Sequence, residues 1–282
     1  MTAAPTTEHG TPAQDTGSAL RAVLADGRRP APASAFAASL AFGWRAMLKL
    51  KHDSEQLIDV TVFPVIMTLM FTYLFGGALA GSADEYVQYL LPGILVMSVM
   101  VITMYTGMGI NVDIAKGVFD RIRTLPIWRP AALVGALLGD VFRYTTASTT
   151  IVLVGLVIGF RPAGGVLGVL ADVALLVVFS FGFSWIWTVL GLLLRSEKAV
   201  MGVSSMVLFP CTFLSNVLVE PDTMPSWLQA FVDVNPVTHV VAAVRGAMHG
   251  TWDLGAITWT LAAAAVLTVG FGTITMRLYN RR

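Results

Sequence analysis

The sequence predicts an all-α membrane protein with six transmembrane helices, an amino-terminal interfacial helix and short outer re-entrant helices between spans five and six. Of its 282 residues, 56% are apolar and 12% are charged, whereas a soluble domain carries about 25% charged residues. Long apolar stretches recur along the chain, and the Lys and Arg residues gather between alternate pairs of them. Because each span takes about 20 residues, the length excludes a large soluble catalytic domain.

The chain divides into three predicted parts. Residues 1–35 are rich in Ala, Pro, Thr and Gly, which predicts a disordered cytoplasmic tail. Residues 36–58 alternate apolar side chains with charges at helical spacing, including Trp44, Arg45 and Lys49, and so predict an amphipathic helix in the membrane interface. An ordinary surface helix is the alternative. Residues 59–282 form the predicted six-span domain.

Six charge-free stretches are predicted to cross the membrane. They cover residues 60–79, 89–110, 144–160, 173–194, 199–219 and 254–276. The third is short, so it needs residues 131–141 or local bilayer thinning to cross. Glycines four residues apart, Gly135 with Gly139 and Gly155 with Gly159, predict close approach between helices.

Charge sorting predicts the orientation. With the amino terminus inside, sixteen Lys and Arg residues lie on the cytoplasmic side, and only Arg161 and Arg245 lie outside. The tail holds three of the sixteen, which leaves thirteen against two. The positive-inside rule therefore places both termini in the cytoplasm. Asp140 and Arg143 are predicted to pair where the third span starts, with Asp140 capping that helix.

Two connecting segments are long enough to carry function. The inner segment, residues 111–143, predicts a short charged helix with an exposed aromatic, ended by Pro126, which suits docking to a cytoplasmic partner. Its candidate coupling residues are Lys116, Phe119, Asp120, Arg121 and Arg123. A positive loop that touches lipid headgroups is the alternative. The outer segment, residues 220–253, predicts a short amphipathic helical turn bounded by Pro225 and Pro236, followed by a second short helical stretch, 237–248. These re-enter the membrane or lie along its outer face, unless they only close the bundle.

The predicted spans contain little charge. Asp172, at the outer start of span four, is interpreted as a helix cap rather than a proton carrier. Spans two and five are rich in Met, aromatic and small polar residues, which favour hydrophobic or amphipathic cargo, although lipid-facing or core methionines explain the pattern equally well. The candidate substrate path comprises Met97, Met104, Tyr105, Phe209, Phe213 and Asn216.

No catalytic, cofactor-binding or metal-ligating residues are predicted. The sequence contains no GxxxxGK[ST] phosphate loop, no GxSxG elbow and no HExxH spacing. Cys211 is the single cysteine, without the partners that a zinc site needs. Any nucleotide that the protein uses must therefore be bound by another chain.

Four stretches carry a family resemblance. EQLIDVTVFPVIMTLMFTYLFGG (55–77), YLLPGILV (89–96), KGVFDRIRTLPIWRPAALVGALLGD (116–140) and MPSWLQ…NPVTHVVAAVRG (224–246) resemble the permease subunits of ABC type-2 exporters. Within that group, they are most similar to daunorubicin and doxorubicin resistance permeases. The resemblance covers about residues 38–280, and KGVFDRIRTLPI is its most specific part.

The resemblance implies a permease of the bacterial inner membrane that acts as a homodimer, or with a second permease, beside two ATP-binding subunits. ATP and Mg would be held by those subunits. Lys116–Arg123 would be the coupling region, and residues 36–51 a second contact. Membrane lipid surrounds such a protein, and no nucleic acid is involved. Relatives export antibiotics, lipids or glycolipids, so export of a lipid or glycolipid is an alternative to drug efflux.

Two other classes of function are weighed against the exporter. An ion-coupled secondary transporter is disfavoured because the predicted spans contain almost no ionisable residues. An enzyme that acts on lipid within the membrane is disfavoured because the sequence shows no catalytic cluster.

Overall fold

The computed structural model describes residues 34–52, 54–79, 82–124, 128, 130–219 and 221–281. The predicted tail, residues 1–35, lies outside these ranges except for its last two residues. Within the described ranges the secondary structure is helical throughout, without strands. This agrees with the predicted all-α class.

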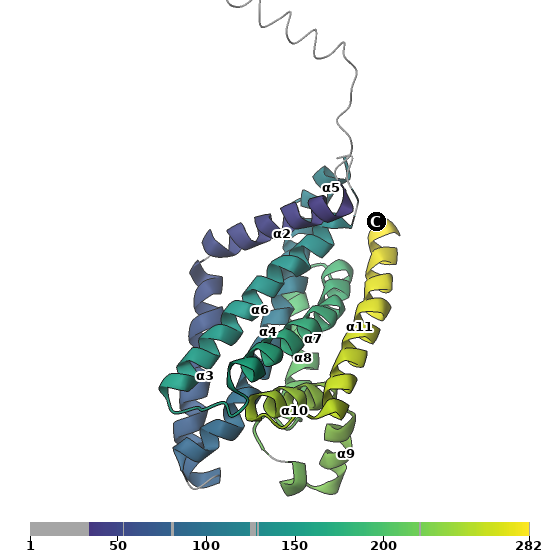
Figure 1. Cartoon of the computed structure of the whole chain (residues 1–282). Coiled ribbons are helices and arrows are strands. Elements are labelled where there is room, and N and C mark those ends of the chain that lie inside the picture. The colour runs from purple at the N-terminus through teal and green to yellow at the C-terminus, as the bar shows by residue number, and fades with distance from the viewer. Residues whose placement is uncertain are drawn as a thin grey trace, which may run out of the picture. The chain divides into compact units, whose positions relative to one another are not determined.

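The helices follow one another along the chain as Figure 1 shows. They are α2 (Ala35–His52), α3 (Ser54–Leu79), α4 (Ala83–Ala115), α5 (Val118–Arg123), α6 (Ala131–Val157), α7 (Gly165–Leu193), α8 (Glu197–Phe213), the 3₁₀ turn η1 (Pro221–Thr223), α9 (Ser226–Val234), α10 (Pro236–His249) and α11 (Leu254–Arg281). Each predicted span coincides wholly or in large part with one of the long helices. The two short helices predicted in the outer segment are α9 and α10.

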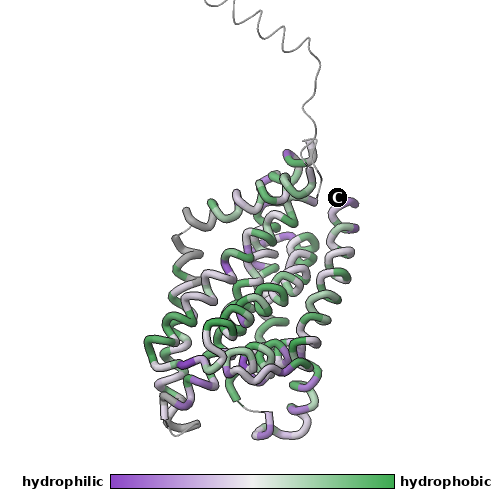
Figure 2. Tube along the Cα trace, viewed as in Figure 1, coloured by the Kyte–Doolittle hydropathy of each residue, from purple (hydrophilic) through white to green (hydrophobic). Residues whose placement is uncertain are grey.

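Three described helices are long and apolar enough to cross a membrane by length and composition. Their apolar parts are Glu85–Ala115, Gly165–Leu193 and Leu254–Arg281. Many apolar side chains on α11 face outward, such as Leu254, Val266 and Val269, which are 74%, 71% and 66% exposed. Surface of this kind is stable only against other apolar material. Along the middle of the long helices apolar residues predominate (Figure 2).

The main core lies where α4, α6, α7 and α10 meet. Trp187, Tyr144 and Phe179 are fully buried there. The polar atoms of the Trp187 and Tyr144 side chains are paired. The Trp187 Nε1–H donates to Thr103 Oγ1 at 2.7 Å, and the Tyr144 hydroxyl bonds Ser184 Oγ at 2.6 Å. Paired hydroxyls and indoles avoid the cost of an unsatisfied polar group in an apolar interior. These bonds join α4 to α7 and α6 to α7.

Helix α2 crosses one end of the bundle and packs on α6 (Figure 1). Gly135 and Gly139 allow this crossing, because a Cβ at Gly135 would meet Phe42 and a Cβ at Gly139 would lie 2.5 Å from the Ala46 Cβ. The predicted packing role of this glycine pair is therefore confirmed. Gly155 packs closely against Leu91 of α4 in the same way.

The amphipathic helix is shorter than predicted. It ends at His52, and residues 54–58 already belong to α3, which leaves in another direction. Residues 51–59 contain no Gly or Pro that would signal this change of direction. Periodicity alone therefore extends the predicted helix to residue 58. An apolar stripe of α2 does point away from α6, and it consists of Phe36, Leu40, Trp44 and Leu48, 40–77% exposed.

Helix α8 is also shorter than the predicted fifth span, since it ends at Phe213 instead of continuing to residue 219. Pro210 supplies no N–H to the preceding turn. The carbonyls beyond it find partners elsewhere in the chain: Asn235 Nδ2 donates to Cys211 O at 2.6 Å and to Leu214 O at 2.9 Å. Non-helical backbone is tolerated at such a place only when its polar groups are paired within the protein.

Candidate functional site

Three elements gather at one end of the bundle: α2, α5 and the carboxyl-terminal end of α11 (Figure 1). This is the end that the charge distribution predicts to be cytoplasmic. It carries the predicted coupling residues and Arg45. Trp44 is 60% exposed on α2, and the side chain of Lys49 lies outside the described residues.

The turn between α4 and α5 is built on a glycine. Lys116 N–H donates to Val112 O and Gly117 N–H donates to Ile114 O, which closes the last turn of α4. Gly117 adopts φ +66°, a left-handed conformation that side-chain-bearing residues rarely adopt. The chain can therefore change direction within two residues and begin α5 at Val118. Thr124, whose Oγ1 bonds Arg121 O at 2.7 Å, ends α5 before Pro126.

The prediction that Phe119 is exposed is wrong. Its side chain is 8% exposed and lies in a cluster with Ile110, Leu133, Leu192 and Tyr279. The Phe119 and Tyr279 rings meet edge to face with centroids 5.5 Å apart, a favoured aromatic geometry. Helix α5 therefore turns its aromatic inward and is anchored on α4, α6, α7 and α11.

The charged face of α5 points the other way. Lys116 and Arg121 are exposed, whereas Ile122 is buried beside Phe119. The side chains of Asp120 and Arg123 lie outside the described residues. The predicted coupling residues thus separate into an internal apolar anchor and outward charges.

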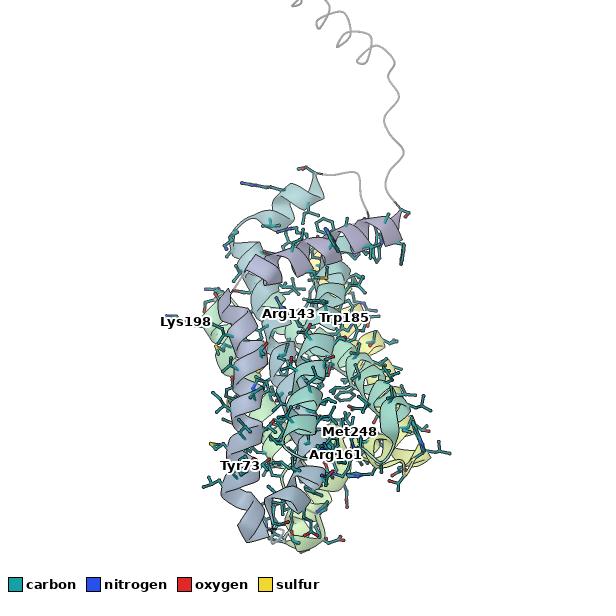
Figure 3. All side chains as sticks on the ribbon, turned by 60° about the vertical axis from the view of Figure 1, so that its left-hand side comes forward. Tyr73, Arg143, Arg161, Trp185, Lys198 and Met248 are labelled. Atoms are coloured by element: carbon teal, nitrogen blue, oxygen red, sulfur yellow. The ribbon has the colours of Figure 1, made fainter. Side chains whose placement is uncertain are left out.

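A cleft of about 80 Å³ lies between α2, α4, α5 and α6. Its charged lining residues are Arg45, Asp113, Asp140 and Arg143. Phe42, Tyr105 and Phe119 line it as well. Arg143 lies below α2 in Figure 3, whereas Arg161 and Met248 lie towards the opposite end. Residues of both predicted coupling elements therefore share one cleft with Tyr105 of the predicted substrate path.

Asp140 and Arg143 pair as predicted, with Arg143 Nη1 2.8 Å from Asp140 Oδ1. The predicted capping role of Asp140 is wrong, because α6 begins nine residues earlier at Ala131. Thr106 of α4 donates its hydroxyl to Asp140 Oδ2 at 2.6 Å. This second bond lets the carboxylate lie buried within the helix and ties α6 to α4. A threonine in an apolar stretch gives no sequence signal for this role.

The predicted substrate-path residues do not meet in one cavity. Met97 and Met104 are buried in the main core. Phe209 and Phe213 are 45% and 48% exposed on the surface of α8. Tyr105 lines the cleft between α2, α4, α5 and α6, and it also lines a cavity of about 170 Å³ beside Phe63 and Pro64 of α3. Asn216 is buried in the segment after α8.

Sequence reasoning missed two polar side chains that hold that segment. Asn235 bonds the end of α8 and also caps α10 by accepting from Val237 N–H at 3.0 Å. Arg245, interpreted only as an outer charge, donates to Asn216 O at 2.9 Å and lies 3.8 Å from the centre of the Tyr89 ring. The Asn-Pro pair at 235–236 is a helix-start signal that identifies Asn235 as a cap, but no sequence pattern shows its second role.

The predicted capping role of Asp172 is also wrong. Helix α7 begins at Gly165, two turns earlier, after a turn through Gly164 and a left-handed Gly165 with φ +61°. Asp172 is 0% exposed, and neither of its carboxylate oxygens has a hydrogen-bond partner. A charge at the edge of an apolar stretch predicts a boundary, but Asp172 lies inside α7.

Exposed apolar helices of span length, with a charged cleft and a short charge-bearing helix at one end of the bundle, are the features of an integral membrane protein. Residues 38–249 match the ABC-2 type transporter family. The chain belongs to this family.

Curated relatives agree with the assignment. The chain is 51% identical over 266 residues, 93% of each chain, to a daunorubicin resistance ABC transporter permease of Streptomyces coeruleorubidus. It is 25% identical over 232 residues, 80% of this chain and 83% of the relative, to a probable doxorubicin resistance ABC transporter permease of Mycobacterium tuberculosis. A putative transport permease of Cyanophora paradoxa is 25% identical over 218 residues, 74% of this chain and 73% of the relative. The chain is a permease subunit rather than an enzyme, and its ATPase is a separate protein.

Proposed function

We propose that the protein is the transmembrane permease of an ATP-driven drug exporter that moves hydrophobic or amphipathic compounds out of the cytoplasm or the inner leaflet. The observation that carries this proposal is the 51% identity, over 93% of both chains, to a permease named for daunorubicin resistance. The apolar surroundings agree with it, because a charged solute in a pathway without compensating charge bears a large desolvation penalty.

The working assembly that we propose contains two permease chains and two ATP-binding subunits, which hold ATP and Mg. Each permease has six spans, α3, α4, α6, α7, α8 and α11, with both termini in the cytoplasm and residues 1–35 as a cytoplasmic tail. Helix α2 lies in the inner interface with its exposed stripe in the acyl boundary. Helices α9 and α10 belong to the outer side, with α10 re-entrant among the spans.

The coupling surface is proposed to consist of the exposed Lys116, which precedes α5, and the exposed Arg121 of α5, together with Asp120 and Arg123 and supported by α2. Movement of the ATP-binding subunit would reach α4, α6, α7 and α11 through the Phe119 anchor. The cargo path is proposed to pass Tyr105 and the exposed side of α8 with Phe209 and Phe213. In the conformation described here, Met97, Met104 and Asn216 do not face this route.

Transport by inside-out vesicles tests the proposal. Vesicles containing the permease and its ATP-binding subunit should accumulate hydrophobic dyes when ATP is added, because accumulation in them corresponds to export. A non-hydrolysable ATP analogue and vesicles without the permease are the controls. Accumulation of a small hydrophilic solute but no hydrophobic dye would contradict the apolar cargo. Movement of a native lipid alone would keep the exporter and replace the drug by a lipid.

Charge reversal on α5 tests the coupling surface. The double variant Lys116→Glu, Arg121→Glu should bind the ATP-binding subunit about thirtyfold more weakly, since losing an interface hot spot costs about 2 kcal/mol. Affinity is measured with purified permease in nanodiscs. Arg277→Glu is the matched control, because Arg277 is an exposed cation near the carboxyl end of α11, and that end of the helix lies beside α5 (Figure 1). Equal affinities for the double variant and the native chain would reject the assignment.

A further inference from the structure

Asp172 is a buried carboxyl group without a partner in the apolar interior. Its side chain is 0% exposed, and both oxygens lack hydrogen bonds. Asp140 shows how this chain satisfies a buried acid, because its two oxygens are bonded by Arg143 and by Thr106. Asp172 receives no such support.

Helix α10 covers the face of α7 on which Asp172 lies. Gly168, one turn before Asp172, packs so closely on α10 that a Cβ there would meet the Ala247 carbonyl oxygen. Leu176, one turn after it, is fully buried in the same cluster as Val244 of α10. Asp172 lies about 10 Å along α7 from Gly165, at 1.5 Å per residue. It is therefore under α10 and inside the outer half of the bundle.

The cation and both imidazoles of α10 are engaged elsewhere. Arg245 donates to Asn216 O and lies over Tyr89. His249 bonds Gln88 O at 3.1 Å, and His239 bonds Asp233 O and stacks on Trp259. Among the described residues, the Asp172 carboxyl therefore has no hydrogen-bonded counter-ion.

A purely structural role does not account for this residue. It begins no helix, accepts no bond and forms no ion pair, whereas an apolar side chain of similar size would pack there without a desolvation penalty. Ionisable residues within membrane segments mark pathways for substrates or ions. The position of Asp172 beneath a short helix on the outer side fits such a pathway.

The chemistry of the site selects the type of ligand. A divalent metal needs several oxygen ligands, and the described residues contain no group of three His, Cys, Asp or Glu side chains that could hold one. An organic cation requires only one counter-charge, because its apolar body is stabilised by the surrounding core. We propose that Asp172 is the counter-ion for the ammonium group of amphipathic amines, which reach it when α10 moves away during the transport cycle. The inference rests on the proposed export function and assigns to one residue, Asp172, the contact with the charged group of the cargo.

The exchange at Asp172 balances in charge. While α10 covers the site, the carboxyl carries its proton, because an ionised and unpaired group there would be strongly destabilised. When an ammonium group arrives, the carboxyl O–H bond breaks and the proton leaves to water. The carboxylate then accepts a hydrogen bond from the ammonium N–H. The site is neutral before and after binding.

A pair of probes that differ only in charge tests the inference. An aromatic primary amine dye and its neutral N-acetyl derivative are offered to vesicles containing the permease and its ATP-binding subunit. Asp172→Asn should lower ATP-dependent uptake of the amine by about tenfold to a hundredfold, the usual range for losing a charged hydrogen bond, and leave uptake of the acetyl derivative unchanged. Asn matches the neutral acid in size, so the variant should fold.

Two further variants complete the test. Asp172→Glu keeps the carboxyl and should retain preference for the amine. Ser180→Ala removes a hydroxyl of α7 that is buried and unpartnered, as the Asp172 carboxyl is. This variant should transport both probes normally. If Asp172→Asn carries both probes like the native chain, or loses both equally, the counter-ion role is wrong while export stands. If the native complex carries neither probe, the proposed export function fails and this inference falls with it.

Discussion

Replacing Phe119 with Ala should lower the free energy of unfolding of the isolated permease by about 3 kcal/mol or more, the usual cost of emptying a buried Phe site. Phe119 is 8% exposed and packs on Tyr279, Ile110, Leu133 and Leu192, so the variant leaves a cavity between α5 and four other helices. Denaturant-induced unfolding of the purified chain in detergent measures the effect, without any ATP-binding subunit present.

Phe142→Ala provides the matched comparison. Phe142 is 46% exposed on α6, so its removal should change the free energy of unfolding by well under half as much, since less apolar contact is lost. If Phe119→Ala unfolds like the native chain and weakens only the binding of the ATP-binding subunit, then Phe119 is an external docking residue after all.

If α5 is the coupling helix, as we propose, the burial of Phe119 changes the step of coupling that this residue serves. An exposed aromatic would bind the ATP-binding subunit directly, and its loss would weaken the complex. A buried aromatic instead fixes α5 to the ends of α4 and α11, so a displacement of the charged face moves those helices with it. Affinity should therefore depend on Lys116 and Arg121, and transmission of the movement on Phe119 and Tyr279.

Sequence periodicity was sufficient to find the long helices and the two short outer ones, because charge-free stretches of span length and proline boundaries are strong signals. It failed where tertiary partners decide the outcome. Helix α8 ends at Phe213 because Asn235 satisfies the carbonyls beyond Pro210. In a six-residue helix such as α5, residue pattern shows two faces but not which one is covered by the rest of the chain.

The charged residues of the site were identified in part. The spacing of Asp140 and Arg143 was enough to predict their pairing. Both Asp140 and Asp172 were nevertheless placed at helix ends, because an acid in an apolar sequence normally marks a boundary. Asp140 is instead buried inside α6, where Thr106 of α4 bonds it, and Asp172 is buried inside α7 without a hydrogen-bond partner. Substrate-path residues were chosen by type, and the direction in which each points depends on helix rotation, which composition does not determine.

Replacing Asp140 with Ala is expected to be as disruptive as the loss of Phe119. The variant removes the carboxylate that pairs with Arg143, whose side chain is 13% exposed, and the acceptor for Thr106. Removing one partner of a buried ion pair costs about 3–5 kcal/mol, because the remaining charge lies in an unfavourable environment. The free energy of unfolding of the isolated chain should fall by about that amount, and ATP-dependent dye transport should decrease because α4 and α6 are no longer joined at the cleft.

Two companion variants separate the effect of the Asp140–Arg143 charges from the effect of the hydrogen bond that joins α4 to α6. Thr106→Val removes only the neutral donor and should cost about 1 kcal/mol. Asp140→Leu combined with Arg143→Met removes both charges, and such apolar replacements are often neutral or stabilising, so the double variant should be more stable than Asp140→Ala. If the double variant also restores transport, the pair serves stability alone. If it is stable but transports poorly, the ion pair has a role in the transport cycle that apolar packing cannot replace. A native-like stability of Asp140→Ala would show that the pair contributes nothing to the fold.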